Sequence, residues 1–444
     1  MQSWIDGRER IVAAWRFMDS ALRPTRTRFG VIVFAVMLGI IHYIDRVCFG
    51  SMNTTIQREL GLTDGDMKWV FWAFTFAYAL FEIPGGWLGD KWGPKRVLIR
   101  IVLFWSAFTA LTGAVTGLVS LLACRFIFGM GEAGGFPNIT KMFSLWLPQE
   151  ERGVAQGITW MCARWGGALS PLLVLYVSNA VGGWRWTFPV FALLGVVWVF
   201  FFSRWFRDDP KDHPKVNAAE LKLLEEASQN RSEHVVIPWR RLLSCRSVLL
   251  LWLYYFCISY VWYFYITWLP KYMEVVLKMD MKASWTAVLG GAPLFFGGIG
   301  CFAGGVMAKR LSKRHTQGGI SRARRVVGVF GMLGAGLCIY LSTRQSDPTW
   351  VMLALGISGF FNDLSMPGAW GACSDIGGKL AGSVSGSMNM LGNMGGALAT
   401  LAVVWVRDAA QGDWNAPLYV AAATYVISAL CWAFIDSDER LERA

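Results

Sequence analysis

Charged residues are scarce in this sequence of 444 residues: only 16% are Asp, Glu, Lys or Arg, against about 25% in soluble domains. Hydrophobic residues make up 55% of the chain, and the mean hydropathy is +0.40. The few charges gather in short stretches between long apolar runs, which excludes an ordinary soluble domain. An apolar helix of roughly 20 residues crosses a bilayer core of about 30 Å and satisfies its own backbone groups in lipid. The sequence therefore predicts an all-α integral membrane protein.

The sequence lacks the residue patterns that several kinds of catalytic or metal site require. The nine cysteines are scattered without a C-x-x-C pair, and the four histidines form no cluster at metal-ligand spacing. No nucleophile elbow or phosphate-binding loop is visible, so we expect neither an enzyme nor a metal or organic cofactor. No cleavable signal is visible either. The net charge of +12 lies in short loops between apolar segments, where it indicates membrane topology and not nucleic-acid binding.

Twelve apolar segments are long enough to span a bilayer. We predict them at residues 29–51, 67–88, 96–115, 117–142, 153–178, 187–206, 248–272, 284–308, 324–343, 349–374, 379–405 and 416–435. Lys and Arg concentrate in alternate loops, with a cluster at 271–282 as the exception, and this bias puts both termini in the cytoplasm. We expect a multi-pass protein of the inner membrane, with the lipid bilayer as a partner.

The spans divide into two sets of six around a polar stretch. The predicted organisation is a cytoplasmic amphipathic segment at 1–28, an N-terminal six-helix bundle at 29–206, a cytoplasmic linker at 207–246 with a helical piece at 218–227, a C-terminal six-helix bundle at 247–436 and a cytoplasmic tail at 437–444. Segments 157–169 and 386–398 share their first Gly, a Gly pair, Ala and Leu without a gap, which indicates a duplication. Duplicated six-helix halves occur in one transporter fold.

The loop after the second span carries a motif. It reads Gly86-Trp-Leu-Gly-Asp90-Lys91-Trp-Gly93-Pro-Lys95-Arg96. The two terminal glycines permit close packing and a tight turn, Asp90 can accept bonds from a neighbouring helix end, and the basic residues hold the loop at the anionic inner leaflet. The motif resembles the signature of the major facilitator superfamily, which implies twelve helices in two pseudo-symmetric six-helix bundles and a role for this loop in conformational exchange. The second-half counterpart at 305–310 lacks the acidic residue.

Nearly the whole chain is similar to a narrower group, the anion:cation symporter family of hexuronate, galactonate, glucarate and phthalate carriers and sialin-like proteins. The segments that carry this resemblance are Tyr43-Ile-Asp45-Arg46, residues 125–137, Thr267-Trp-Leu-Pro270 and residues 385–393. The resemblance implies a secondary transporter of a small organic anion. It also implies that Asp45 and Glu132 load and release the coupling proton.

Five charged residues fall inside the apolar spans: Asp45, Arg46, Arg125, Glu132 and Arg164. A charge at mid-membrane costs roughly 2.5–3.5 kcal/mol, so five facing lipid would cost on the order of 12–18 kcal/mol, more than the net stability of about 5–15 kcal/mol of a typical protein. They must therefore face the protein interior, a cavity or each other. Arginine offers a planar fork suited to a carboxylate, although structural ion pairs, such as Arg125 with Glu132, remain the alternative.

We predict that the substrate-binding residues are Tyr43, Arg46, Tyr78, Arg125, Arg164, Tyr263, Trp370, Ser374, Asn389 and Asn393. Tyrosine and asparagine supply neutral hydrogen bonds to hydroxyl groups. Several have a structural alternative: Arg164 as a helix contact, Tyr78 as packing, and the asparagine pair as a link between helices. For Glu82 and Asp363 we expect structural bonds.

The functional hypothesis is proton-coupled import of a sugar acid by a monomer with alternating access around a central site. The first alternative is another anion, such as an aromatic acid, a dicarboxylate or an amino-acid derivative. The aromatic residues of the seventh span favour an aromatic ligand, and Arg164 favours a dicarboxylate. A sensor built on a transporter scaffold is a more remote alternative, as is a membrane enzyme.

Overall fold

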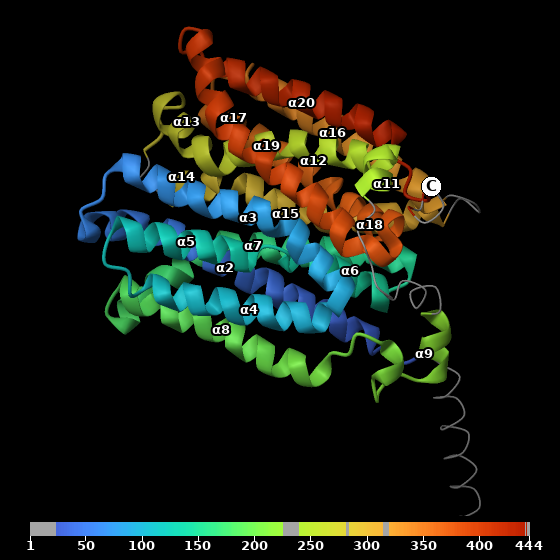
Figure 1. Ribbon diagram of the computed structural model, residues 1–444. Helices are drawn as coiled ribbons and strands as arrows, with labels where there is room; N and C mark the ends of the chain where they lie inside the picture. Colours follow the sequence, from blue (N-terminus) through green and yellow to red (C-terminus); the bar gives the residue numbers. More distant parts are fainter. Residues whose placement is uncertain (1–23, 225–238, 281–283, 314–318, 440, 442–444) are drawn as a thin grey trace, which may run out of the picture.

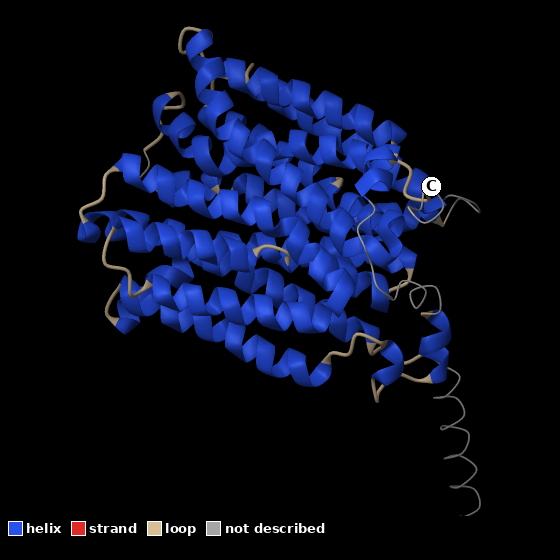
Figure 2. Cartoon of the chain, in the orientation of Figure 1, coloured by secondary structure: helices blue, strands red, loops and turns tan. Residues whose placement is uncertain are grey.

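The computed structural model of the chain describes residues 24–224, 239–280, 284–313, 319–439 and 441. Within these ranges the regular elements are helices and no strand occurs, as Figure 2 shows. The predicted all-α class is therefore confirmed. Most of the amphipathic segment predicted at 1–28 lies outside the described residues.

The N-terminal half is built from helices that run back and forth across the molecule (Figure 1). They are α2 (Arg28–Leu60), α3 (Asp64–Trp92), α4 (Pro94–Thr112), α5 (Leu118–Glu132), α6 (Gly135–Trp146), α7 (Gln149–Val181) and α8 (Trp184–Trp205). The predicted single span at 117–142 is divided between α5 and α6 by a break at Gly134, which has φ 83°. The backbone of Gly134 lies against that of Gly85 in α3, so a side chain at either position would clash with the other helix.

The C-terminal half repeats this arrangement. Its elements are α12 (Arg246–Tyr263), the π-helix η2 (Phe264–Trp268), α13 (Leu269–Val275), α14 (Ser284–Gly290), α15 (Ala292–Ser312), α16 (Gly319–Ser342), α17 (Pro348–Leu364), α18 (Met366–Gly377), the 3-10 turn η3 (Gly378–Leu380), α19 (Ala381–Ala409) and α20 (Asn415–Phe434). The break between α17 and α18, next to Pro367, occupies the place of the break between α5 and α6. Both halves thus interrupt their fourth span.

Eight stretches of described helix are long and apolar enough to cross a membrane, and one of them, 348–409, contains two of the predicted spans. The remaining predicted spans correspond to α3, α4 and α7, which have 29, 19 and 33 residues. At about 1.5 Å per residue these helices also have roughly the length of a bilayer core. The predicted twelve-span architecture agrees with this arrangement.

The two halves meet along two helix pairs related by pseudo-symmetry, α3 with α19 and α7 with α15. Glycines bring the backbones together in both pairs. Gly86 lies against the carbonyl group of Gly382, and Gly157 against that of Cys301. Small residues allow such close helix packing in a membrane. We call the end of the molecule where α9 and α11 lie in Figure 1 the linker end.

The linker between the halves contains η1 (Pro210–Asp212), α9 (Ala218–Leu223) and α11 (Trp239–Ser244). The helical piece predicted at 218–227 begins where expected and ends at Leu223; residues 225–227 lie outside the described ranges. Asn217 caps α9 by accepting a hydrogen bond from the Glu220 backbone N–H at 2.9 Å.

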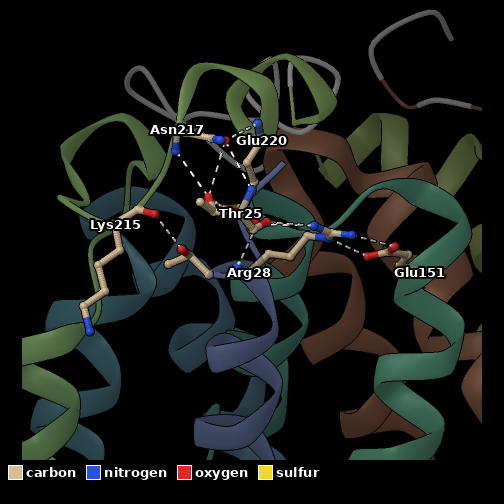
Figure 3. Close-up of polar contacts among 7 residues, drawn as sticks. Thr25, Arg28, Glu151, Lys215, Asn217 and Glu220 are labelled. Atoms are coloured by element: carbon tan, nitrogen blue, oxygen red, sulfur yellow. Dashed lines mark hydrogen bonds and ion pairs between the residues drawn. The ribbon is translucent and has the colours of Figure 1, made fainter. Parts of the chain in front are cut away.

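Figure 3 shows how α9 is held against the N-terminal half. The Arg28 guanidinium lies between two carboxylates, with its Nε 2.9 Å from Glu151 Oε2 and its Nη1 3.3 Å from Glu220 Oε1. The Thr25 hydroxyl also donates to Glu220. Because α2, α7 and α9 are joined through this cluster, the first part of the linker is docked on the N-terminal half.

Candidate functional site

Arg46 lies on α2 in the interior of the molecule. Its Nε donates to Glu132 Oε2 at 2.9 Å, and its guanidinium stacks over the Tyr78 ring at 4.2 Å. The Arg46 side chain is nevertheless 26% exposed, whereas Glu132 is fully buried. Its Nη2 has no hydrogen-bond partner among the described residues. Arg46 therefore keeps donor capacity for a further anion.

Arg125 on α5 has aromatic neighbours in place of a carboxylate. Its guanidinium lies 4.3 Å from the ring centre of Phe49, 4.5 Å from that of Phe74 and 4.8 Å from that of Phe128. These faces stabilise the cation by roughly 0.5–2 kcal/mol each. In the described structure Arg125 makes no ion pair, and its buried Nε has no hydrogen-bond partner. The alternative of a structural pair between Arg125 and Glu132 is not formed, because Glu132 binds Arg46.

Arg164 on α7 is fully engaged. Its Nε and Nη2 donate to the two carboxylate oxygens of Asp363 on α17, at 2.9 and 3.3 Å, and its Nη1 donates to the Tyr43 hydroxyl at 2.9 Å. The ring centre of Trp262 lies 3.4 Å from the guanidinium. The pair is buried and joins the two halves. Asp363 thus makes the structural bond that we expected, and Arg164 takes the helix-contact alternative in this conformation.

A chain of hydrogen bonds connects the halves beside Arg46. Asn389 on α19 donates to Glu82 Oε1 at 2.5 Å and to the Tyr78 hydroxyl at 3.4 Å. Asn393 donates to the Asn389 carbonyl at 2.9 Å and accepts from the Tyr263 hydroxyl at 3.0 Å. Four predicted site residues are therefore brought together, and Glu82 anchors them.

Tyr43 and Tyr263 occupy equivalent positions in the two halves. The Tyr43 ring packs over Gly167, and the Tyr263 ring packs over Gly396. These glycines are the second members of the Gly pairs in the two repeated segments. Arg46 interacts electrostatically with both tyrosines. The repeat therefore places one phenol from each half within electrostatic range of the same guanidinium.

Two predicted residues lie elsewhere. The Trp370 indole on α18 is buried, donates to the Tyr255 hydroxyl at 3.2 Å and packs 5.4 Å from the Trp160 ring. The Ser374 hydroxyl is buried and donates to the Trp370 carbonyl at 3.4 Å. No contact between either side chain and Arg46 or Arg125 occurs in the described part of the chain, so their substrate-binding role stays a prediction.

The loop motif joins the two halves at the linker end. Asp90 accepts hydrogen bonds from the backbone N–H groups of Gly382 and Ser383, at 3.1 and 2.7 Å, and from the Ser383 hydroxyl at 2.6 Å. These groups begin α19, so the carboxylate caps a helix of the opposite half. Lys141 of α6 lies 3.3 Å from Asp90 and donates to the Lys379 carbonyl at 2.6 Å.

The rest of the motif shapes the turn between α3 and α4. Gly93 has φ 83°, a conformation that favours glycine. The Lys95 backbone N–H donates to Asp208 Oδ1 at 2.9 Å, and burial raises the pKa of Asp208. Lys91 lies over the Trp87 ring, and Arg96 is exposed. The role of this loop in conformational exchange remains a prediction.

A second cluster at the linker end was missed by the sequence analysis. Asp375 on α18 binds Arg152 of the N-terminal half and Arg324 of its own half, each at 2.6 Å, and accepts from Gln149 at 3.1 Å. Arg152 and Asp375 are 223 positions apart, and nothing local in the sequence links them. Together with Asp90, this cluster holds the halves together at the linker end.

His42 was also missed. Its Nε2 lies 3.4 Å from Glu132 Oε1, and its ring packs edge-on against Trp105 at 5.2 Å and Phe136 at 4.8 Å. Its position was a usable signal, since it precedes Asp45 by three residues and Arg46 by four and so lies on the same helix face. In the described ranges, no group of three or more His, Cys, Asp or Glu side chains is placed to hold a metal ion.

Comparisons with known proteins agree with this architecture. The profile of the Major Facilitator Superfamily matches residues 35–400. The "Probable sulfoacetate transporter SauU" of Cupriavidus necator is 34% identical over 93% of this chain and 94% of its own length. The "Probable galactarate/D-glucarate transporter GarP" of Escherichia coli K12 is 29% identical, over 96% of this chain and 98% of its own length. The crystal structure of the E. coli fucose:proton symporter FucP superposes with a TM-score of 0.68 at 13% identity and covers 92% of this chain and 99% of that chain.

Proposed function

This chain belongs to the Major Facilitator Superfamily, and we propose that it imports a sugar acid together with protons, by alternating access, across the inner membrane. Its relatives indicate the coarser activity, which is transport of small organic anions such as sugar acids. The sequence relatives and the fold are those of transporters and not of enzymes. The observation that carries the proposal is the pair of interior arginines, Arg46 and Arg125, which retain unused donors.

These arginines support an anionic cargo through their energetics. Removing a guanidinium from water costs several kcal/mol unless an anion compensates it. Arg46 shares one carboxylate, Glu132, and Arg125 has only aromatic faces among the described residues. A cargo carboxylate that binds both would supply the missing compensation. The phenols of Tyr43 and Tyr263 and the amide of Asn393 can bind hydroxyl groups beside it, which supports a sugar acid. Because the site is built from both halves of one chain, we propose that a monomer transports.

Competition for Arg46 supplies a route to proton coupling. Cargo binding at Arg46 displaces Glu132, which pairs with no other arginine among the described residues. The released carboxylate then takes up a proton, which avoids a buried unpaired charge. Asp45, whose two buried oxygens have no hydrogen-bond partner in the described structure, is the second proton carrier.

Transport also requires opening the linker end, which we assign to the cytoplasmic face. The contacts of Asp90 and Asp375 close that end, so the structure corresponds in this proposal to a conformation that has not yet released cargo inward. Opening must break both sets of contacts and the mid-membrane pair of Arg164 with Asp363.

Uptake into proteoliposomes tests the proposal. Labelled D-glucarate, D-glucuronate and galactarate are offered with and without an inward proton gradient. We expect gradient-dependent accumulation of at least one acid, lost in Arg46→Gln and Arg125→Gln and retained in Arg407→Gln, whose side chain lies at the far end beside Asp408. Accumulation that ignores the gradient would contradict proton coupling, and normal uptake by both interior variants would contradict the assigned site.

A dianion is a second candidate cargo, and Arg164 favours it. Arg164, the third interior arginine, can bind the second acidic group of a dicarboxylate or a sulfonated acid if that group replaces Asp363. Replacement would keep the buried cation compensated while the halves separate. Sulfoacetate and galactarate belong in the same uptake panel. Arg164→Gln is expected to weaken their uptake at least about tenfold and to spare D-glucuronate, the monoacid, since an ionic hydrogen bond contributes roughly 1.5–3 kcal/mol. Equal losses for monoacid and dianions would instead indicate that Arg164 has only a structural role.

A further inference from the structure

A buried polar cluster of the N-terminal half contains more unsatisfied atoms than ion pairs. Five buried side-chain atoms have no hydrogen-bond partner among the described residues: both carboxylate oxygens of Asp45, Nε2 of His42, Oε1 of Glu132 and Nε1 of Trp105. An unsatisfied buried polar atom costs about 1–3 kcal/mol. Such a concentration in one place calls for a functional explanation.

His42 lies beside Glu132 and one helical turn before Asp45 on α2. It is 2% exposed, and its Nε2 is 3.4 Å from Glu132 Oε1, within reach although not aligned as a hydrogen bond. Asp45 is three residues along the same helix face, where side chains lie about 5–6 Å apart at Cβ. Trp105 lies beside Asp45 without a well-aligned hydrogen bond.

The surroundings of His42 contain several titratable or charged groups. Asp45 and Arg46 come from its own helix, Tyr78 from α3 with ring centres 6.3 Å apart, and Glu132 from α5. The neighbours from α4 and α6, Trp105 and Phe136, are aromatic and do not titrate. The imidazole therefore lies against the Glu132 carboxylate, shares a helix face with Asp45 and is shielded from water by aromatic rings.

We propose that His42 transfers the proton between Asp45 and Glu132, an inference that rests on the proposed proton coupling and adds a residue to it. The O–H bond of protonated Asp45 breaks as an N–H bond forms at the imidazole, which becomes an imidazolium ion. The N–H bond at Nε2 of the imidazolium then breaks, and its proton joins Glu132 Oε1. His42 ends neutral, Asp45 ends as a carboxylate and Glu132 ends protonated. Cargo binding at Arg46 frees the Glu132 carboxylate for the second transfer.

A purely structural His42 would also pack against the same rings, so the test separates packing from proton transfer. His42→Gln keeps a polar side chain of similar reach, and His42→Phe keeps the aromatic contacts; neither carries a proton. The matched control is His213→Gln, since His213 also packs edge-on against two tryptophans, Trp146 and Trp205, but lies in the linker. Labelled D-glucarate and sulfoacetate serve as the cargo probes.

Two rates are measured in proteoliposomes, cargo-driven proton influx by an internal pH dye and cargo counterflow at equal pH on both sides. Proton transfer by a positioned group is worth about 10²–10⁴ in rate, so both His42 variants should lose proton influx at least about tenfold. Counterflow should remain close to wild type, and His213→Gln should resemble wild type in both assays.

Normal proton influx in both His42 variants would overturn the assignment of His42 alone. Parallel loss of counterflow and proton influx in both variants would also overturn it, because that pattern indicates a packing role. Absence of proton influx in the wild-type protein, with counterflow present, would overturn the proposed proton coupling itself and the role of His42 with it.

Discussion

At the scale of single residues, the arginines of the interior differ in what surrounds them and not in their type. Arg46 forms an ion pair with Glu132, and Arg125 packs against aromatic rings. Arg164 donates hydrogen bonds to Asp363 and to the Tyr43 hydroxyl. The sequence predicted all three as buried cations because each interrupts an apolar span. It could not rank them, since the Asp363 partner of Arg164 lies 199 positions away and leaves no local signal.

Arg125→Lys tests whether shape matters as well as charge. Lysine keeps the cation but loses the planar fork that matches a carboxylate and stacks on Phe49, Phe74 and Phe128. We expect KM for the transported acid to rise about tenfold to a hundredfold, since an ionic hydrogen bond contributes roughly 1.5–3 kcal/mol. Initial uptake rates over a range of acid concentrations give KM. Arg407→Lys is the control, and an unchanged KM for Arg125→Lys would mean that cargo does not meet this guanidinium.

At the scale of helices, the sequence predicted the spans better than their interruptions. The break at Gly134 depends on the approach of Gly85, and the π-helix η2 lies inside a run that is apolar throughout. Neither feature has a local cause that periodicity reveals. The repeated segments begin at Gly157 and Gly386, and in the structure each of these glycines lies against a carbonyl group of the opposite half.

Gly86→Ala probes the tightest of these contacts. A Cβ at position 86 would collide with the Gly382 carbonyl, whereas a Cβ at Gly153 of α7 meets no atom within 4 Å. Overpacking of this kind costs about 1–3 kcal/mol. We expect thermal unfolding in detergent to occur several degrees lower in Gly86→Ala, and Gly153→Ala to be neutral or slightly stabilising. A wild-type melting temperature for Gly86→Ala would contradict this expectation, because it would show that the contact between α3 and α19 accommodates the added methyl group.

The contact between the end of α2 and the start of α8 predicts a pH dependence. The Trp184 indole and the Arg185 guanidinium donate to Glu59 at 2.5 and 2.8 Å and lower its pKa, the indole bond having the larger effect. A native pKa below the unfolded one stabilises the fold above the unfolded value of about 4.3, and this gain is lost as pH falls through the native pKa.

Melting curves from about pH 6 to about pH 3 measure this gain, because the window spans the ordinary pKa of a glutamate. Wild-type protein should lose more thermal stability over that interval than Glu59→Gln, which has no charge to lose. Identical acid sensitivity in the two proteins would count against the contact.

At the scale of the whole molecule, the sequence predicted the all-α class, the twelve spans and the two related halves. These properties depend on the length of the apolar runs and on an internal repeat, and both features are visible in the amino-acid sequence. The conformation is a different matter. The contacts at the linker end involve Asp375, Arg152 and Arg324, which come together only in the tertiary structure.

Asp375→Asn tests this closure. Loss of a buried carboxylate leaves Arg152 and Arg324 without their shared counter-charge, which costs about 3–5 kcal/mol when a buried pair is broken. We expect the linker end to open more often, so that Cys301, buried where α15 meets Gly157, is alkylated faster by a thiol reagent. Mass spectrometry of the labelled peptide measures the rate, and Asp408→Asn, in an exposed pair, is the control. Unchanged alkylation would mean that the other contacts suffice to keep the end shut.

The docking of α9 through Arg28, Glu151 and Glu220 has a practical consequence for watching this protein work. The docked helix should travel with the first six spans as one rigid body, while the start of α12 travels with the last six. The distance between spin labels or fluorophores at Lys222 and Arg246 would then change whenever the two halves move against each other as proposed. These labels would follow each transport cycle from positions outside the proposed cargo-binding site.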